Sequence, residues 1–101
     1  MANEKLLESK LRRDVKKMGG MAIKFVSPGH AGVSDRIVIM PGGLIWFVEL
    51  KSEGKKLSPL QKIFKRQMED LKCRYWLVDC PEMLAECLHE IEYITKIKNS
   101  K

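Results

Sequence analysis

The order of apolar and polar residues along the chain predicts seven elements of secondary structure. The first is a helix over residues 3–18, in which apolar side chains recur every three or four positions. Asn3 is a suitable N-cap for this helix, and Gly19-Gly20 would end it. The apolar stripe of the helix consists of Leu7, Leu11, Val15 and Met18.

Three short apolar runs follow this helix and predict β-strands. They cover residues 21–26, 35–40 and 44–51. A Gly-rich loop separates the first two runs, and the turn signal Pro41-Gly42-Gly43 separates the second from the third. The second and third runs are therefore expected to form a β-hairpin.

The second half of the chain predicts a helix, a strand and a further helix. Ser58-Pro59-Leu60-Gln61 combines a Ser N-cap, Pro at the first helical position and Gln at the third, which is the capping-box pattern. A strand over 75–78 and a helix from Pro81 follow, and a basic, frayed tail is expected from Lys96. The buried face of the helix after Ser58 is expected to comprise Leu60, Ile63, Phe64, Met68 and Leu71.

These elements predict a single α/β domain over residues 1–101, in the order α-β-β-β-α-β-α. The third and fourth strands are joined through a helix, so they should be parallel, with a right-handed crossover. Because the hairpin strands are antiparallel, the sheet should be mixed. The helices should cover the sheet and leave one end of its strands open.

The charge balance favours a polyanionic partner. Lys and Arg number 19 against 13 Asp and Glu, a formal net charge of +6, which favours nucleic acid before a membrane surface. No apolar run approaches the ~20 residues of a membrane span, and the charged N-terminus lacks a signal-peptide core. Three cysteines without a C-x-x-C pair argue against a disulfide framework and a structural zinc site. We therefore expect an intracellular protein that is not secreted.

The predicted hairpin can bring two carboxylates and an ammonium group together. Side chains alternate along a strand, so Glu49 and Lys51 share one face. A three-residue loop, Pro41-Gly42-Gly43, places Asp35 opposite Glu49, with Cβ atoms ~4.5–5.5 Å apart. A two-residue loop, Gly42-Gly43, instead places Asp35 opposite Leu50 and on the other face. The hypothesis of a shared site thus requires the odd-length loop or a compensating bulge.

Two carboxylates at that distance favour a divalent cation between them, because like charges repel without one. Mg²⁺ or Mn²⁺ would accept carboxylate, carbonyl and water oxygens, and the backbone carbonyl of Leu50 is a candidate ligand. Such an ion polarises a phosphoryl oxygen and acidifies a water, while Lys51 would position or activate that water. The pattern predicts metal-assisted hydrolysis of a phosphodiester, without an organic cofactor.

Each of these residues also has a purely structural interpretation. Glu49 and Lys51 could be an exposed edge pair, and Asp35 could be a turn residue. Gln61 is most simply a capping residue, and Glu8 could be a solvated residue beside the first apolar stripe. Only their occurrence together favours a site.

Basic residues from the first helix to the start of the helix after Ser58 predict a nucleic-acid-binding surface. His30 is the one histidine in this set, and it could instead be a loop residue without a role. The candidates are Lys10, Arg12, Arg13, Lys16, Lys17, Lys24, His30, Arg36, Lys55, Lys56 and Lys62.

The ordered set of motifs resembles the VRR-NUC (virus-type replication-repair nuclease) family of the PD-(D/E)xK nuclease superfamily. The resemblance runs from about Glu8 to Val78. It rests on Glu8, Lys24-Phe25-Val26-Ser27-Pro28-Gly29, Gly32-Val33-Ser34-Asp35-Arg36, Glu49-Leu50-Lys51 and Leu57-Ser58-Pro59-Leu60-Gln61. One position departs from the pattern, since Ser34 stands where the family usually has Pro, whose fixed φ would make the entry into the strand more rigid.

The resemblance implies a restriction-endonuclease-like fold with a central mixed sheet flanked by helices. It implies Asp35 and Glu49 as metal ligands and Lys51 as the catalytic lysine. It also implies Glu8 and Gln61 as active-site helpers, with Glu8 a further possible ligand.

The resemblance also implies a Mg²⁺- or Mn²⁺-dependent DNA endonuclease. Without an appended domain, the chain resembles the free-standing viral members, which look like homodimers that act on branched DNA such as four-way junctions. The apolar stripes of the first and last helices are candidates for a dimer contact, although both could simply cover the sheet. A flap or single-strand nuclease and a non-catalytic nucleic-acid-binding module are the alternatives, and the intact set of Asp35, Glu49 and Lys51 argues against the last.

Overall fold

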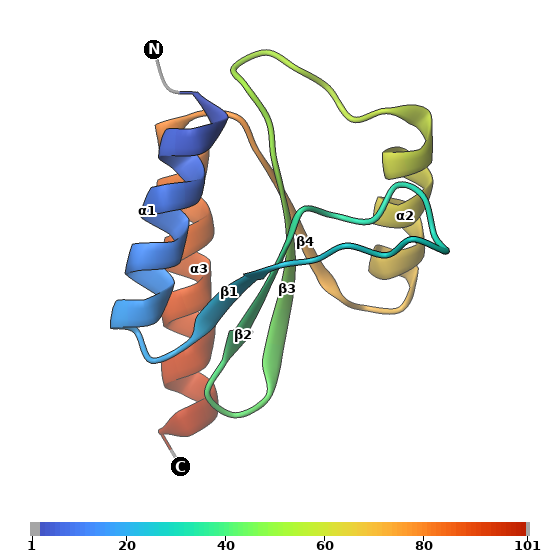
Figure 1. Ribbon diagram of the computed structural model, residues 1–101. Helices are drawn as coiled ribbons and strands as arrows, with labels where there is room; N and C mark the ends of the chain where they lie inside the picture. The colour runs from blue at the N-terminus through green and yellow to red at the C-terminus, as the bar shows by residue number, and fades with distance from the viewer. Residues whose placement is uncertain (1–2, 101) are drawn as a thin grey trace.

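The computed structural model describes residues 3–100 and confirms the predicted order of elements. Figure 1 shows their arrangement around the sheet. The elements are α1 (Glu4–Lys17), β1 (Met21–Lys24), β2 (Arg36–Met40), β3 (Leu44–Leu50), α2 (Pro59–Asp70), β4 (Arg74–Val78) and α3 (Pro81–Asn99).

The four strands form one mixed sheet in the order β1-β2-β3-β4. β1 and β3 each pair with β2 antiparallel, and β4 pairs with β3 in parallel. α2 lies between β3 and β4 in the chain and makes the crossover that a parallel pair requires. The predicted α/β architecture is therefore confirmed.

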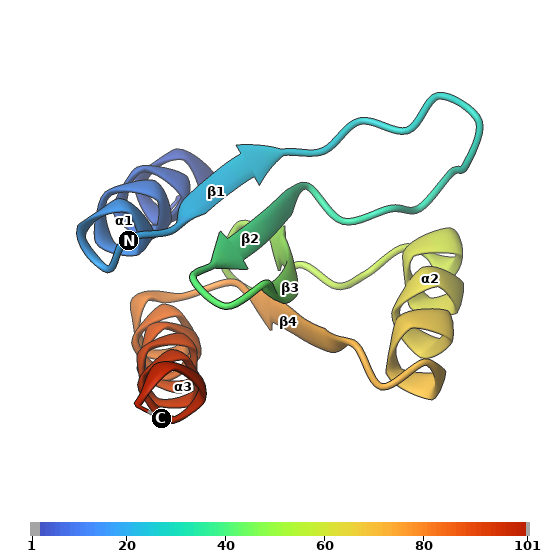
Figure 2. The same ribbon diagram turned by 90° about the horizontal axis from the view of Figure 1, so that it is seen from below.

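The hydrophobic core lies between the sheet and two helices. Figures 1 and 2 show α1 and α3 side by side on one face of the sheet, with α2 on the other side near one end of the strands. Leu11 and Val15 of α1 and Leu84 and Ile91 of α3 are completely buried against Trp46 and its neighbours in the sheet. The predicted stripes of both helices therefore cover the sheet.

Glu90 fixes α3 to two strands of the sheet. Its Oε2 accepts hydrogen bonds from the indole N–H of Trp46 at 2.9 Å and of Trp76 at 2.8 Å. The guanidinium carbon of Arg74 lies 5.2 Å from the centre of the Trp46 ring, within the range of a cation–π contact. The polar atoms of both indoles are thereby satisfied inside or beside the core.

The predicted buried face of α2 was wrong in part. Phe64 is buried, but Leu60, Ile63 and Leu71 are 53%, 54% and 69% exposed. α1 and α3 pack on the opposite face of the sheet, and no other helix covers the outer half of the α2 stripe within residues 3–100 (Figure 2). The amphipathic pattern thus located the stripe correctly and overestimated how much of it is covered.

Some predicted boundaries also change. β1 ends at Lys24 rather than Val26, and β2 and β3 are each one residue shorter than expected at the end near Asp35 and Lys51. The tail expected to fray from Lys96 continues α3 to Asn99. The side-chain amide of Asn99 donates to the carbonyl oxygen of Pro41 at 3.0 Å, which holds the end of the helix against the hairpin turn.

No helix within residues 3–100 combines the length and apolar character needed to cross a membrane.

Candidate active site

The hairpin adopts the odd-length alternative. Met40 pairs with Leu44 around the turn Pro41-Gly42-Gly43, and the pairing continues to Arg36 opposite Val48. Gly42 and Gly43 have φ of 90° and 76°, values that glycine adopts without the steric cost other residues meet. One step beyond the last pair, Asp35 and Glu49 lie opposite each other.

The two carboxylate residues are in direct contact. The backbone N–H of Asp35 donates to Oε1 of Glu49 at 3.2 Å, across the open end of β2 and β3. The Glu49 side chain is only 2% exposed, and Nζ of Lys51 lies 3.6 Å from its Oε2. The structure therefore brings together the Asp, Glu and Lys predicted from the hairpin pattern.

The pKa of Glu49 is raised to about 7, first because the carboxyl group is buried and then because of the nearby charge of Asp35. The ammonium of Lys51 opposes this rise without cancelling it. A buried carboxylate facing a second carboxylate is a donor set that suits a hard divalent cation such as Mg²⁺ or Mn²⁺. Leu50 lies between Glu49 and Lys51 with its side chain in the core, so its backbone carbonyl is at the same strand end.

Gln61 links the start of α2 to Glu49. Its Oε1 accepts from the backbone N–H of Ser58 at 2.8 Å, and Oγ of Ser58 accepts from the backbone N–H of Gln61 at 3.2 Å. Nε2 of Gln61 donates to Oε2 of Glu49 at 3.3 Å. The capping interpretation is thus confirmed, and the same side chain also contacts the candidate site.

The loop between β1 and β2 packs against the first turn of α2 at Gly32. This residue has φ of 85°, and a Cβ added there would overlap the carbonyl group of Leu60. At the other side of the loop, the backbone N–H of Phe25 donates to the carbonyl oxygen of Asp35 at 2.8 Å. The loop that carries Asp35 is therefore positioned from both ends.

Replacing Gly32 with Ala should destabilise the domain by about 1–3 kcal/mol, because Ala meets both the positive φ and the α2 backbone. The midpoint of thermal unfolding measures this. Gly29→Ala is the matched control, since a Cβ there has no neighbour within 4 Å, and it should leave the midpoint nearly unchanged. Equal midpoints for the two variants would contradict the close packing of the loop on α2.

Glu8 lies apart from the carboxylate pair in this structure. Its Oε2 is 2.8 Å from a guanidinium nitrogen of Arg36, whose side chain is mostly buried. The hydrogen bond from Arg36 lowers the pKa of Glu8, and the charges of Arg12 and Lys24 lower it further. Within residues 3–100, no group of three or more His, Cys, Asp or Glu side chains is arranged to hold a metal ion. A ligand role for Glu8 would thus require this ion pair to open, as would a phosphate contact by Arg36.

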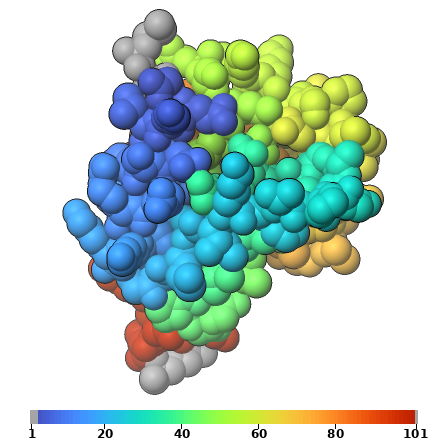
Figure 3. Space-filling view, viewed as in Figure 1, coloured from blue at the N-terminus to red at the C-terminus, as the bar shows by residue number. Residues whose placement is uncertain are grey.

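Most of the other predicted basic residues lie on the surface. Figure 3 shows α1, β1 and the loop that follows β1 on one face of the molecule. Lys10 pairs with Asp14 at 2.9 Å, and His30 lies in the loop before Asp35 with its ring 6.0 Å from that of Phe64. The remaining exposed members of the predicted set are Arg12, Arg13, Lys16, Lys17, Lys24, Lys55, Lys56 and Lys62.

Tyr75 lies beside the site on β4 and is not among the site residues predicted from the sequence. Its hydroxyl is buried without a hydrogen-bond partner among the described residues. Burial raises its pKa, and the charges of Glu49 and Asp35 raise it further. Its pairing with Phe47, two residues before Glu49, depends on the parallel register, which the sequence alone does not set.

Comparisons with known proteins agree with this arrangement. No protein-family model matches the sequence. A solved structure described as a VRR_NUC domain has a TM-score of 0.80 and 26% sequence identity, covering 87% of this chain and 97% of that chain. The chain has the fold of a VRR_NUC domain.

A phage protein is also similar to this chain in sequence. A protein of Acyrthosiphon pisum secondary endosymbiont phage 1, provisionally named nuclease p44, is 49% identical to this chain over 61 residues. The match covers 60% of this chain and 66% of that protein, just under two thirds of the relative's length. The resemblance identified from the motifs is confirmed.

Proposed function

We propose that this VRR-NUC-type domain is a nuclease that hydrolyses phosphodiester bonds of DNA with Mg²⁺ or Mn²⁺. The observation that carries the proposal is the contact of Asp35 with Glu49 beside Lys51, at the open end of the strands. The similarity to a VRR_NUC structure and to a phage protein provisionally named as a nuclease supports it. The net charge of +6 suits a DNA substrate, which would place the activity inside a cell.

Each residue at the site has a distinct proposed role. Asp35, Glu49 and the carbonyl of Leu50 would hold the cation, which when bound polarises the phosphate and acidifies a water. Lys51 would position that water and offset negative charge that develops on the phosphate oxygens. Gln61 would keep the Glu49 carboxylate oriented through the hydrogen bond at 3.3 Å.

Glu8 is proposed as a helper whose position Arg36 controls. The 2.8 Å ion pair holds Glu8 against Arg36, the first residue of β2, which directly follows Asp35 in the chain. Rotation away from Arg36 would allow its carboxylate to approach the cation or its waters, and the liberated guanidinium could then contact a phosphate. Arg36 would thus act on the site mainly through Glu8.

A homodimer that cuts branched DNA, such as a four-way junction, is the finer proposal. Two symmetric cuts need two sites, which a two-fold dimer supplies. The stripes of α1 and α3 are occupied by the core, so a different surface is needed. The outer face of the sheet carries exposed apolar side chains in adjacent, paired positions, which suits contact with a second copy. These are Met21, Ile23, Ile39 and Ile45.

A cleavage assay on labelled linear, flap and four-way DNA tests the function. Mg²⁺ or Mn²⁺ should support cutting, whereas Ca²⁺ should support binding with little turnover because its longer, looser coordination misplaces the water. Full activity in excess EDTA would refute the mechanism. A preference for flaps or single strands by a monomer, measured by sedimentation, would favour the alternative nuclease, and binding without cleavage under all conditions would favour a non-catalytic module.

Binding should weaken steeply with salt, because Lys and Arg release counterions from the phosphates they neutralise. Replacing Lys55 and Lys56 with Ala should make the plot of log K against log salt less steep. The decrease in slope should be the amount that about two phosphate contacts contribute. Lys96→Ala with Lys98→Ala is the matched control at the far end of α3, and it should leave the slope unchanged. A slope that is the same for both double variants would remove the loop from the proposed DNA surface.

A further inference from the structure

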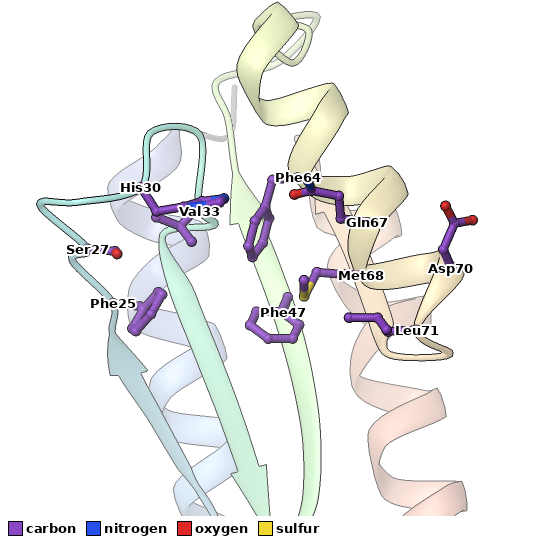
Figure 4. A pocket seen from close by; sticks show the side chains of 10 residues that line it. All are labelled: Phe25, Ser27, His30, Val33, Phe47, Phe64, Gln67, Met68, Asp70 and Leu71. Atoms are coloured by element: carbon purple, nitrogen blue, oxygen red, sulfur yellow. The ribbon is translucent and has the colours of Figure 1, made fainter.

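An apolar groove of about 690 Å³ opens between α2 and the loop that follows β1. Figure 4 shows its side chains converging from the loop, from β3 and from α2. Its walls include Phe25, Val33, Phe47, Phe64, Met68 and Leu71. The size is that of a small-molecule site. Phe64, Met68 and the exposed Leu71 of the α2 stripe form one of its sides.

The groove adjoins the candidate active site. Phe47 and Glu49 are two residues apart on β3, so their side chains share a face about 7 Å apart along the strand. Phe64 lies one helical turn after Gln61, the residue that contacts Glu49. A nucleotide whose phosphate lies at the two carboxylates could therefore reach the groove with its base, because the gap is about the length of one sugar.

The chemistry of the walls suits a flat aromatic ligand. The ring of Phe64 packs edge-to-face on Phe47, with centroids 5.5 Å apart, and on His30, with centroids 6.0 Å apart. Polar groups of His30 and Gln67 lie among the lining side chains, where they can meet the hydrogen-bonding edge of a ring. A nucleobase has this combination of apolar faces and a polar edge.

We propose that the groove binds one unpaired nucleobase next to the phosphate held at Asp35 and Glu49. The proposal rests on the proposed function and deepens it, because it names the local structure of the substrate. A base inside a duplex is stacked and cannot enter a side groove unless it leaves the helix. The domain should therefore prefer DNA that is unpaired on at least one side of the cut, as at a flap, a junction or a single strand.

A binding experiment separates the base from the phosphates. The probes are a short fluorescent thymidylate oligonucleotide and the same backbone carrying abasic residues, with Ca²⁺ as the only divalent cation. Both probes offer the same phosphates, so a difference in Kd measures the bases. The wild-type domain should bind the thymidylate about tenfold more tightly or better, because stacking on aromatic side chains is of that size.

Two variants assign the preference to the groove. Phe25→Ala should reduce the ratio of the two Kd values several-fold, and Tyr93→Ala, which removes an exposed aromatic ring from α3, should preserve it. Leu71 is exposed, so Leu71→Ala should fold normally and still lower the ratio of the two Kd values. Leu6 is an exposed leucine on α1, and Leu6→Ala should leave the ratio unchanged.

Equal affinities for the two probes would overturn the proposal, as would an unchanged ratio in both groove variants. A shift from dimer to monomer in Phe25→Ala or Leu71→Ala with an unchanged ratio would likewise overturn it and assign the groove to a second copy of the chain. The cleavage assay is independent of these outcomes. Cutting without a base preference would reject the groove alone, and a base preference without cutting would reject the catalytic function alone.

Discussion

Asp35→Asn should abolish metal-supported cleavage while the domain stays folded and, without metal, becomes more stable. Asn keeps the backbone N–H that donates to Glu49 and removes the charge that contributes to the raised pKa of Glu49. It also replaces a charged carboxylate ligand with a neutral amide, so the cation should bind far more weakly. We expect cleavage to fall at least about a thousandfold, as for other groups essential to a transition state.

The stability gain should depend on pH in a defined direction. The folded-state pKa of Glu49 is about 7 against an ordinary value of 4.5, so the folded protein binds the extra proton between these values. Stability without metal should therefore fall as pH rises through that window, by on the order of 3 kcal/mol at most, and then level off. Above neutral pH, Asp35→Asn should recover about 1–2 kcal/mol of the lost free energy of unfolding, and at acid pH it should recover little.

Thermal unfolding in EDTA at acid and at mildly alkaline pH measures the gain. Asp14→Asn is the matched control, because it removes a carboxylate of α1 that pairs with Lys10 away from the site. This control should retain cleavage and show no alkaline gain. An Asp35→Asn protein that cuts DNA at the parental rate would refute the proposed metal site.

The contact tested by this variant was predictable from the sequence only as one of two alternatives. Pro41-Gly42-Gly43 is compatible with a two-residue and a three-residue loop, and the two loops place Asp35 on opposite faces. The identity of the turn residues does not decide between them, since glycine accepts the φ of either. Packing of the core selects the three-residue loop, because the observed register places Val38, Trp46 and Val48 in one buried layer.

Other features depended on contacts between distant segments. The ion pair of Glu8 with Arg36 joins α1 to β2, and neither residue has a local pattern that reveals it. The exposed side of α2 could not be predicted from its periodicity. An apolar stripe shows which helix face is apolar, and it does not show how much of that face the neighbouring elements cover. Local signals performed better, since the Asn3 cap and the Ser58 capping box occur as predicted.

Ser34 illustrates how a departure from the family pattern can be compensated. Proline at this position would fix φ at the entry to β2. Ser34 is completely buried, and its hydroxyl donates to the carbonyl oxygen of Arg36 at 3.3 Å. This local hydrogen bond restrains the residues around Asp35 by a different means, so the position of Asp35 does not depend on proline.

Lys51→Met should lower kcat by about a hundredfold to a thousandfold and leave KM nearly unchanged. Met preserves much of the length of the side chain and removes the ammonium that lies 3.6 Å from Glu49. The lost charge would act mainly in the transition state, where negative charge develops on the phosphate, so the loss should appear in kcat. Steady-state cleavage of a flap or four-way substrate in Mn²⁺ measures both constants.

Lys56→Met is the informative comparison, because it makes the same chemical change in the loop after β3. Lys56 is exposed and proposed to contact phosphate, an interaction made equally in the bound ground state and the transition state. Its loss should raise KM and leave kcat nearly unchanged. If Lys51→Met instead raised only KM, Lys51 would be a binding residue like Lys56, and the activation of water would have to be assigned to another group at the site.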